Sequence, residues 1–249
     1  AAVLTATTFA ALILALGNAA QREPWPWIAA PLAVTGVAGA LLLRRQAGHP
    51  APMLPLDLLG RPMFALSTVT AMAAFAAQGL AFVSLPFFFE QVLHLDPIRT
   101  GFLMMAWAIV VALAAPIAGR MSDHHPPGLL GGVDLAVLCL GMVSLALLPA
   151  APHTLDIVLR MALCGAGFGF FQSPNLKALM SSAPPERSGG ASGVIGMARL
   201  IGQTTGAALV ALCFGLAGNL HGPTWALGLG AMFAGLASMA SFARLWARS

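Results

Sequence analysis

The strongest constraint on this chain is a succession of apolar runs, each about 20 residues long, separated by short segments rich in Pro and Gly. A helical run of that length matches the thickness of the hydrocarbon core of a bilayer. A soluble domain carries about 25% charged residues, whereas only 8% of these 249 residues are charged and 59% are hydrophobic. So few charges cannot cover the surface of a soluble fold, so the sequence predicts an all-α integral membrane protein.

The positions of the apolar runs predict about eight membrane-spanning helices. No run alternates polar and apolar residues with a period of two, which excludes spanning strands. Pro and Gly mark the breaks between the runs, for example Gly222 and Pro223 after the seventh. The predicted spans are Val3–Ala20, Trp27–Leu43, Met63–Pro86, Gly101–Gly119, Leu129–Leu148, Leu155–Asn175, Gly190–Leu216 and Trp225–Leu245.

The basic residues are unequally distributed between the two sides of the predicted bundle. The segments after the odd-numbered spans hold only Arg22 and Arg99. Those after the even-numbered spans hold Arg44, Arg45, Arg61, Arg120, Lys177, Arg187, Arg244 and Arg248. Because positively charged loops stay in the cytoplasm, we expect a multi-pass protein of the plasma (inner) membrane with both ends of the chain cytoplasmic.

The eight predicted spans divide into a pair and a set of six. Residues 1–46 hold the pair, residues 47–62 form a Pro-rich cytoplasmic linker loop, and residues 63–249 hold the six. Six spans are what one half of a transporter built from three-helix inverted repeats needs. Because the chain starts without Met and almost inside its first apolar run, we expect it to be a fragment or to lack residues upstream.

The loop between the fourth and fifth predicted spans reads "AGRMSDHHPPG" and resembles a cytoplasmic loop motif of the major facilitator superfamily. Gly119 and Asp123 match the motif, and Arg120 lies between them. His124 and His125, followed by two prolines, stand where the family has basic residues and a Gly. The resemblance implies a conformational latch in which Asp123 pairs with a helix N-terminus or an Arg. The residues alone fit a polar turn between two helices equally well.

The seventh predicted span and the segment before it, "PPERSGGASGVIGMARLIGQTTGAALVAL", resemble the fourteen-span drug:proton antiporter branch of that superfamily. The segments "PLDLLGRPMFA" and "LPFFFEQVLHLDPIRTGFLMM" resemble the same branch. The residues that carry the match in the seventh span are Arg187, Gly190, Ala191, Ser192, Arg199, Gly202 and Gly206.

This resemblance implies that residues 1–46 are the extra central helix pair of that branch and that residues 63–249 are its C-terminal transporter half. The N-terminal half, with any acidic residues that bind protons or cations, would then lie outside this chain. The implied function is proton-coupled export of drugs or lipophilic organic cations. The expected partners are the lipid bilayer, a small organic substrate, protons and the missing half.

Two arginines lie inside predicted spans, where a charged side chain costs roughly 2.5–3.5 kcal/mol on insertion scales. Arg160, in a stretch that resembles the Arg-containing span of the family, lies near a span end and can either serve coupling or reach the interface. Arg199 lies about nine residues into its helix, so we expect it to face protein or a cavity. Gln172 and Asn175 of the sixth span are its expected neighbours.

The remaining candidates are polar or small residues within spans. Gln78, Gln172, Asn175 and Gln203 can line a substrate path or hydrogen-bond between helices. Gly165, Gly169, Gly202 and Gly206 allow close approach of helices. Asp134 lies near a predicted cytoplasmic helix end, where we expect water to reach it.

We predict no enzyme activity, no cofactor, no metal site and no nucleic-acid binding. The chain has one Lys and no phosphate-binding loop, and His124 and His125 have only Asp123 close by, which is too few ligands for zinc. Its basic residues do not cluster with aromatics. Two other hypotheses remain open: a carrier of another solute (sugar, amino acid or siderophore), and a non-transporting membrane partner or inactive truncated product.

Overall fold

The computed structural model describes residues 4, 7, 8, 10, 11, 14, 15, 18, 24–46, 56–149 and 151–246, and these residues form helices and turns without a strand. The protein is therefore an all-α integral membrane protein, as predicted. The elements are α2 (Trp25–Gln46), α3 (Leu56–Leu59), α4 (Pro62–Phe87), the π-helix η1 (Phe88–Val92), α5 (Pro97–Met121), α6 (Pro127–Ala146), α7 (Thr154–Ser181), the 3-10 helix η2 (Pro185–Arg187) and α8 (Ser188–Ala243).

Two predicted segments lie partly outside the described residues. Of the span Val3–Ala20, only residues 4, 7, 8, 10, 11, 14, 15 and 18 are described, and these are helical. Residues 47–55 of the predicted linker loop are outside, as are Arg22 and Arg248 of the charge count. The second predicted span corresponds to α2, whose apolar part is Trp25–Leu41.

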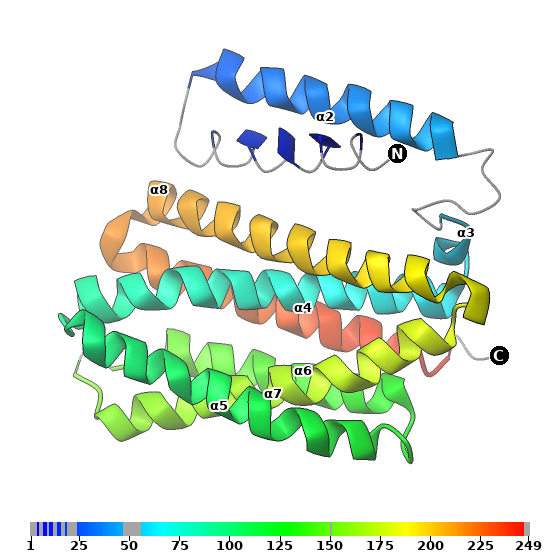
Figure 1. The fold of residues 1–249 in the computed structure, drawn as a ribbon. Helices are drawn as coiled ribbons and strands as arrows, with labels where there is room; N and C mark the ends of the chain where they lie inside the picture. Colours follow the sequence, from blue (N-terminus) through cyan, green and yellow to red (C-terminus); the bar gives the residue numbers. More distant parts are fainter. Residues whose placement is uncertain are drawn as a thin grey trace.

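Within the described residues, five helices are long and apolar enough to cross a membrane, the first running through α4 and η1 from Pro62 to Val92. The last, α8, has 56 residues, and at 1.5 Å per residue a straight helix of that length would measure about 84 Å. The helix breaks at Gly218, whose φ of 73° and ψ of 177° are essentially restricted to Gly. Residues 188–217 form a first arm and residues 219–243 a second arm, which Figure 1 shows running back along the bundle.

The break lies in the predicted gap between Leu216 and Trp225, but at Gly218 rather than at Gly222 and Pro223, which were predicted to mark it. Both residues lie in the second arm, where Gly222 is packed against the first arm: a Cβ at Gly222 would come within 2.9 Å of the Phe214 Cα. Pro223 is the fifth residue of that arm and lies inside the helix, where neighbouring groups in a membrane protein can satisfy the carbonyl that it frees. The turn itself requires a backbone conformation that only Gly218 adopts.

Prolines also start helices and lie within them. Pro62, Pro97 and Pro127 each occupy the first turn of a helix, and the Asp96 side chain caps α5 by accepting from the Arg99 N–H at 3.0 Å. Two predicted spans end too early, at Pro86 and at Asn175, because the helices continue past Pro86 into η1 and past Pro174 to Ser181. Membrane helices accept interior prolines because neighbouring groups satisfy the freed carbonyls.

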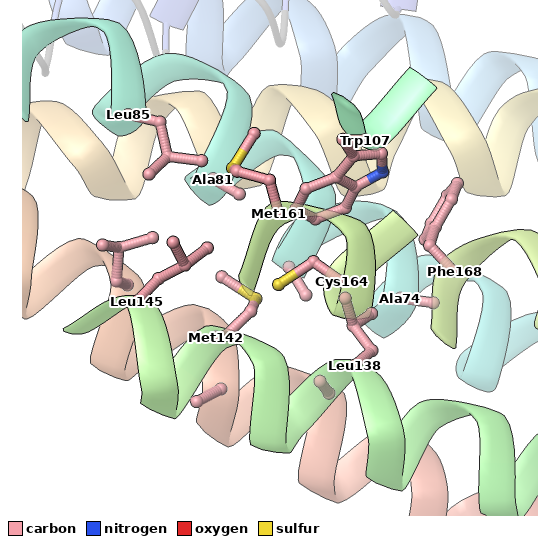
Figure 2. Packing of buried hydrophobic residues seen from close by; sticks show 14 of the residues in the cluster. Ala74, Ala81, Leu85, Trp107, Leu138, Met142, Leu145, Met161, Cys164 and Phe168 are labelled. Atoms are coloured by element: carbon pink, nitrogen blue, oxygen red, sulfur yellow. The ribbon is translucent and has the colours of Figure 1, made fainter. Parts of the chain in front are cut away.

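Helix α4 contacts α7, α8 and η1. Helix α6 packs on α7 and α8, and α5 packs on α7. In Figure 1, α2 lies outside this group. The main core contains Trp107, Leu138, Met142, Met161 and Phe168, which meet from α5, α6 and α7 (Figure 2). The packing of this core involves apolar side chains and no charged group.

The closest helix contacts occur at glycines. A Cβ at Gly165 would lie 2.6 Å from the Trp107 carbonyl oxygen, and one at Gly169 would lie 2.9 Å from the Val111 Cα, so α7 is in backbone contact with α5. On the first arm of α8, a Cβ at Gly202 would lie 2.5 Å from the Met72 carbonyl oxygen of α4. At Gly206 the corresponding distance to the Ala76 carbonyl oxygen is 2.4 Å.

We predict that Gly206→Ala destabilises the protein by about 1–3 kcal/mol, because backbone atoms of α4 cannot move aside without separating the helices. The measurement is the thermal unfolding midpoint of the full-length protein in detergent. Gly228→Ala on the second arm is the matched control, since nothing lies within 4 Å of its added Cβ. Equal midpoints for the two variants would contradict the role given to this contact.

Candidate functional site

A pocket of about 230 Å³ lies between α4, α5, α7 and the first arm of α8. Its wall is mostly apolar, with a few polar side chains, as is usual for sites that bind small organic molecules. The described lining holds one cationic group and no carboxylate. The lining residues are Ala71, Phe75, Ala115, Phe171, Gln172, Ser173, Asn175, Leu176, Ile195 and Arg199.

The pocket brings together three residues singled out from the sequence, namely Gln172, Asn175 and Arg199. Arg199 is exposed, and its guanidinium carbon lies 5.8 Å from the centre of the Phe75 ring. At that distance the ring face attracts the positive charge. The cation is therefore held over α4 at the edge of the pocket, where a bound molecule can reach it.

Asn175 lies in a network that sequence reasoning missed. It is 4% exposed, and its Oδ1 accepts from Arg244 Nη1 at 2.9 Å. The same Arg244 nitrogen donates to Ser67 Oγ at 3.1 Å, and Nη2 donates to Ser241 Oγ. Asn175 also donates from Nδ2 to the Ser67 carbonyl oxygen at 3.3 Å.

Arg244 therefore differs from the sequence prediction, which placed it among the basic residues of exposed segments. It is only 1% exposed, because the second arm of α8 ends against α4, α6 and α7. Its acceptors come from α4 (Ser67), α7 (Asn175) and α8 itself (Ser241). A signal was present in the sequence: Ser238, Ser241 and Arg244 recur at intervals of three, which places them on one helix face. Ser238 and Ser241 donate to the carbonyl oxygens of Gly132 and Gly128 on α6.

Gln78 and Gln203 pair with each other across the contact between α4 and α8. Gln203 Nε2 donates to Gln78 Oε1 at 3.1 Å. Neither residue is among those that line the pocket. Of the two roles predicted for them, the geometry provides the hydrogen bond between helices.

Arg160 lies at the other end of α7, away from the pocket lining. Its Nε donates to Asp156 Oδ1 at 2.9 Å, one turn earlier, and its Nη1 donates to the Ser144 carbonyl oxygen of α6. The carboxylate and the carbonyl offset the cost of placing the guanidinium within an apolar helix. Asp134 also departs from expectation, because its Oδ2 is buried and has no hydrogen-bond partner among the described residues.

Asp123, in the loop between α5 and α6, forms an ion pair with Lys177 near the end of α7. Lys177 Nζ lies 2.7 Å from Asp123 Oδ1 and 2.9 Å from the Ser122 carbonyl oxygen. The hydrogen bond and the positive charge of Lys177 lower the pKa of Asp123. The partner of Asp123 is thus the Lys177 side chain of α7, and not a helix N-terminus or an Arg. Arg120 is exposed, and a Cβ at Gly119 would meet nothing within 4 Å.

These contacts define one end of the bundle, which we call the basic end: the end that carries Arg61, Arg120, Lys177, Arg187 and Arg244. Arg61 Nη1 donates to the Ser182 carbonyl oxygen at 3.0 Å, which joins the start of α4 to the end of α7. Across the part of the chain that the structure describes, no group of three or more His, Cys, Asp or Glu residues could hold a metal ion. The chemistry available in the pocket is binding by rings, amides and a cation.

Comparison with known proteins gives one family and several relatives. The family model described as Major Facilitator Superfamily matches residues 1–207. The chain is 49% identical over 211 residues to YebQ of Escherichia coli K12, an uncharacterized transporter, covering 85% of this chain and 46% of that protein. It is 30% identical over 183 residues to the multidrug resistance protein Stp of Mycobacterium tuberculosis, covering 72% and 33%.

A third relative carries a different printed substrate. The riboflavin transporter RibZ of Clostridioides difficile is 28% identical over 149 residues, covering 60% of this chain and 33% of that protein. In these matches the chain spans at most 46% of the relative's length. More than half of each of these relatives therefore lies outside the region that matches this chain.

We predict that Lys177→Met raises the pKa of Asp123 toward its ordinary value, because the variant removes both the hydrogen bond and the charge that lower it. The stabilisation from this pair is present at neutral pH and is lost as the pH falls through the lowered pKa. The measurement is an NMR titration of labelled Asp carboxyl carbons. Arg120→Met is the control, and an equal shift in both variants would contradict the pairing.

Proposed function

This chain belongs to the Major Facilitator Superfamily, and on that premise we propose that it forms the C-terminal part of a secondary transporter that exports drugs or lipophilic organic cations in exchange for protons. The observation that carries this proposal is the pocket between α4, α5, α7 and the first arm of α8. Phe75 and Phe171 can pack against a flat apolar molecule, and Gln172 and Asn175 can orient it. Its named relatives include multidrug resistance and efflux proteins, which supports drugs as the substrate class.

The organisation proposed for the chain is that of part of a longer transporter, which is consistent with a match to less than half the length of these relatives. We assign residues 1–46 to an extra helix pair, residues 47–62 to a linker loop and residues 63–249 to one transporter half. A second half, outside this chain, would face the pocket and complete the cavity. Alternating access would then arise from rocking of the two halves around the bound substrate.

Proton coupling is assigned to that second half in this proposal. A group that exchanges protons during transport needs a titratable side chain in contact with the cavity. The described lining has only Arg199 as an ionisable residue, and an arginine remains charged at neutral pH. Carboxylates on the facing half would supply both the proton site and the recognition of a cation.

A second candidate function is transport of an uncharged or anionic aromatic solute. The lack of a carboxylate in the described lining favours it, and RibZ is a riboflavin transporter by name. Uptake and efflux assays in membrane vesicles distinguish the two candidates. Saturable, proton-dependent movement of ethidium supports cation export, whereas movement of riboflavin without ethidium supports the second candidate.

We predict that Arg199→Ala lowers ethidium transport about three- to tenfold, because the variant removes the guanidinium donors and the contact with the Phe75 ring that shape the edge of the pocket. Arg199→Lys should retain an intermediate rate, since the charge remains while the planar donor group is lost. The measurement is initial ethidium efflux at matched membrane abundance. Arg99→Ala, at the end opposite the basic end, is the control, and parental activity in Arg199→Ala would remove Arg199 from the site.

We also predict that the basic end faces the cytoplasm, because positively charged segments are retained there. A Cys introduced at His124 should resist a membrane-impermeant thiol reagent in intact cells, whereas a Cys at Asn219 should react. Both positions are exposed and lie at opposite ends of the bundle. The reverse pattern of labelling would invert the orientation.

A further inference from the structure

We propose that Arg244 is a positioning residue for the pocket: its guanidinium fixes the Asn175 side chain in the pocket wall and thereby couples the end of α8 to the binding site. The inference rests on the proposed role of the pocket in transport. Its starting point is that Asn175 belongs both to the pocket lining and to the hydrogen-bond network of Arg244. It lines the pocket, and its Oδ1 accepts a hydrogen bond from Arg244 at 2.9 Å.

Among the described residues, the hydrogen-bond acceptors that surround the Arg244 guanidinium are all neutral. Its hydrogen-bond partners are Ser67 Oγ, Asn175 Oδ1 and Ser241 Oγ. Its Nε is buried without a partner in the described part of the chain, and the salt bridges found there involve other arginines and Lys177. A buried cation in such surroundings is a poor source of stability. The role of Arg244 is better explained by the orientation that its hydrogen bonds impose on the Asn175 side chain.

That geometry concerns the orientation of an amide. A guanidinium has donors and no acceptor, so only the oxygen of the Asn175 amide can face Arg244. The amide nitrogen is then directed to the Ser67 carbonyl oxygen, 3.3 Å away. The Ser67 carbonyl oxygen can only accept, so it favours the same orientation, but without Arg244 the Asn175 oxygen loses this donor and the longer contact to Ser67 is left to hold the amide. Arg244 therefore anchors the oxygen side of the Asn175 amide in the pocket wall.

The space for the guanidinium is provided by α6. A Cβ at Gly131 would lie 2.7 Å from Ser241 Oγ and 3.0 Å from Arg244 Nη2. A side chain at this position would push the guanidinium away from its partners. The arrangement thus depends on α4, α6, α7 and the second arm of α8 together. A shift of the second arm relative to α7 would change the Arg244–Asn175 bond and, through it, the pocket.

The first test is a double-mutant cycle on ethidium transport. Arg244→Gln should raise the KM about tenfold, which corresponds to the loss of one hydrogen bond to a charged group. In the Asn175→Ala background the same change should have little further effect, because the residue that it positions is gone. Arg244→Lys should recover part of the affinity. An undiminished effect of Arg244→Gln in the Asn175→Ala background would overturn the proposal.

The second test needs no substrate and so separates this inference from the proposed function. A Cys introduced at Gln172 in the full-length protein reports the state of the pocket wall through its rate of reaction with a water-soluble maleimide. The protein without that Cys is the blank. Arg244→Gln and Gly131→Ala should each change the rate several-fold at unchanged abundance, and Gly235→Ala should not.

Gly235→Ala is a suitable control because its added Cβ would meet only Cys139 Sγ, at an ordinary distance of 3.6 Å. Unchanged labelling in both Arg244→Gln and Gly131→Ala would refute the coupling of α8 to the pocket. If labelling changes while the parent protein moves no ethidium, the positioning role stands and the proposed drug substrate fails.

Discussion

Between α4 and the first arm of α8, backbone lies against backbone, and the pocket takes its shape from this contact. An added Cβ at Gly206 would approach the Ala76 carbonyl oxygen to 2.4 Å, and one at Gly79 would approach the Gln203 carbonyl oxygen to 2.7 Å. Helices this close bring Arg199 over the Phe75 ring and allow Gln203 to reach Gln78. In a bilayer, such packing replaces the hydrophobic driving force that holds soluble helices together.

Positive charge is concentrated on and behind the pocket, while the carboxylates have other partners or lie elsewhere. Arg199 lies in the lining and Arg244 lies behind Asn175. Asp123 is paired with Lys177 in the loop region, and Asp156 with Arg160 at the opposite end of α7. The described lining is therefore suited to the acceptor groups and rings of a small molecule. Recognition of a cationic group requires acidic residues from outside the described lining.

Much of the fold could be predicted because each apolar run reports the bilayer directly. The runs from Met63 to Leu245 correspond to four helices and the two arms of α8. The predicted spans ended too early at Pro86 and at Asn175, where the helices continue. The turn before the last span lies in the predicted gap between Leu216 and Trp225, but at Gly218 rather than at Gly222 and Pro223. A membrane helix can continue past a proline because neighbouring groups can satisfy the freed carbonyl, whereas the Gly218 backbone conformation does end the first arm.

The candidate residues could be named from the sequence, but their partners could not. Arg160 and Arg199 stand out because a charge within an apolar segment is costly, and Asp123 stands out because its loop resembles a family motif. The sequence alone determined the membrane class, the helical periodicity and the glycines that permit close contact. Only the tertiary structure decided that Arg244 is buried on Asn175, that Lys177 holds Asp123 and that Gln78 pairs with Gln203. These pairs join residues 54 to 125 positions apart, and which helix faces meet depends on the packing of the whole bundle rather than on any local pattern.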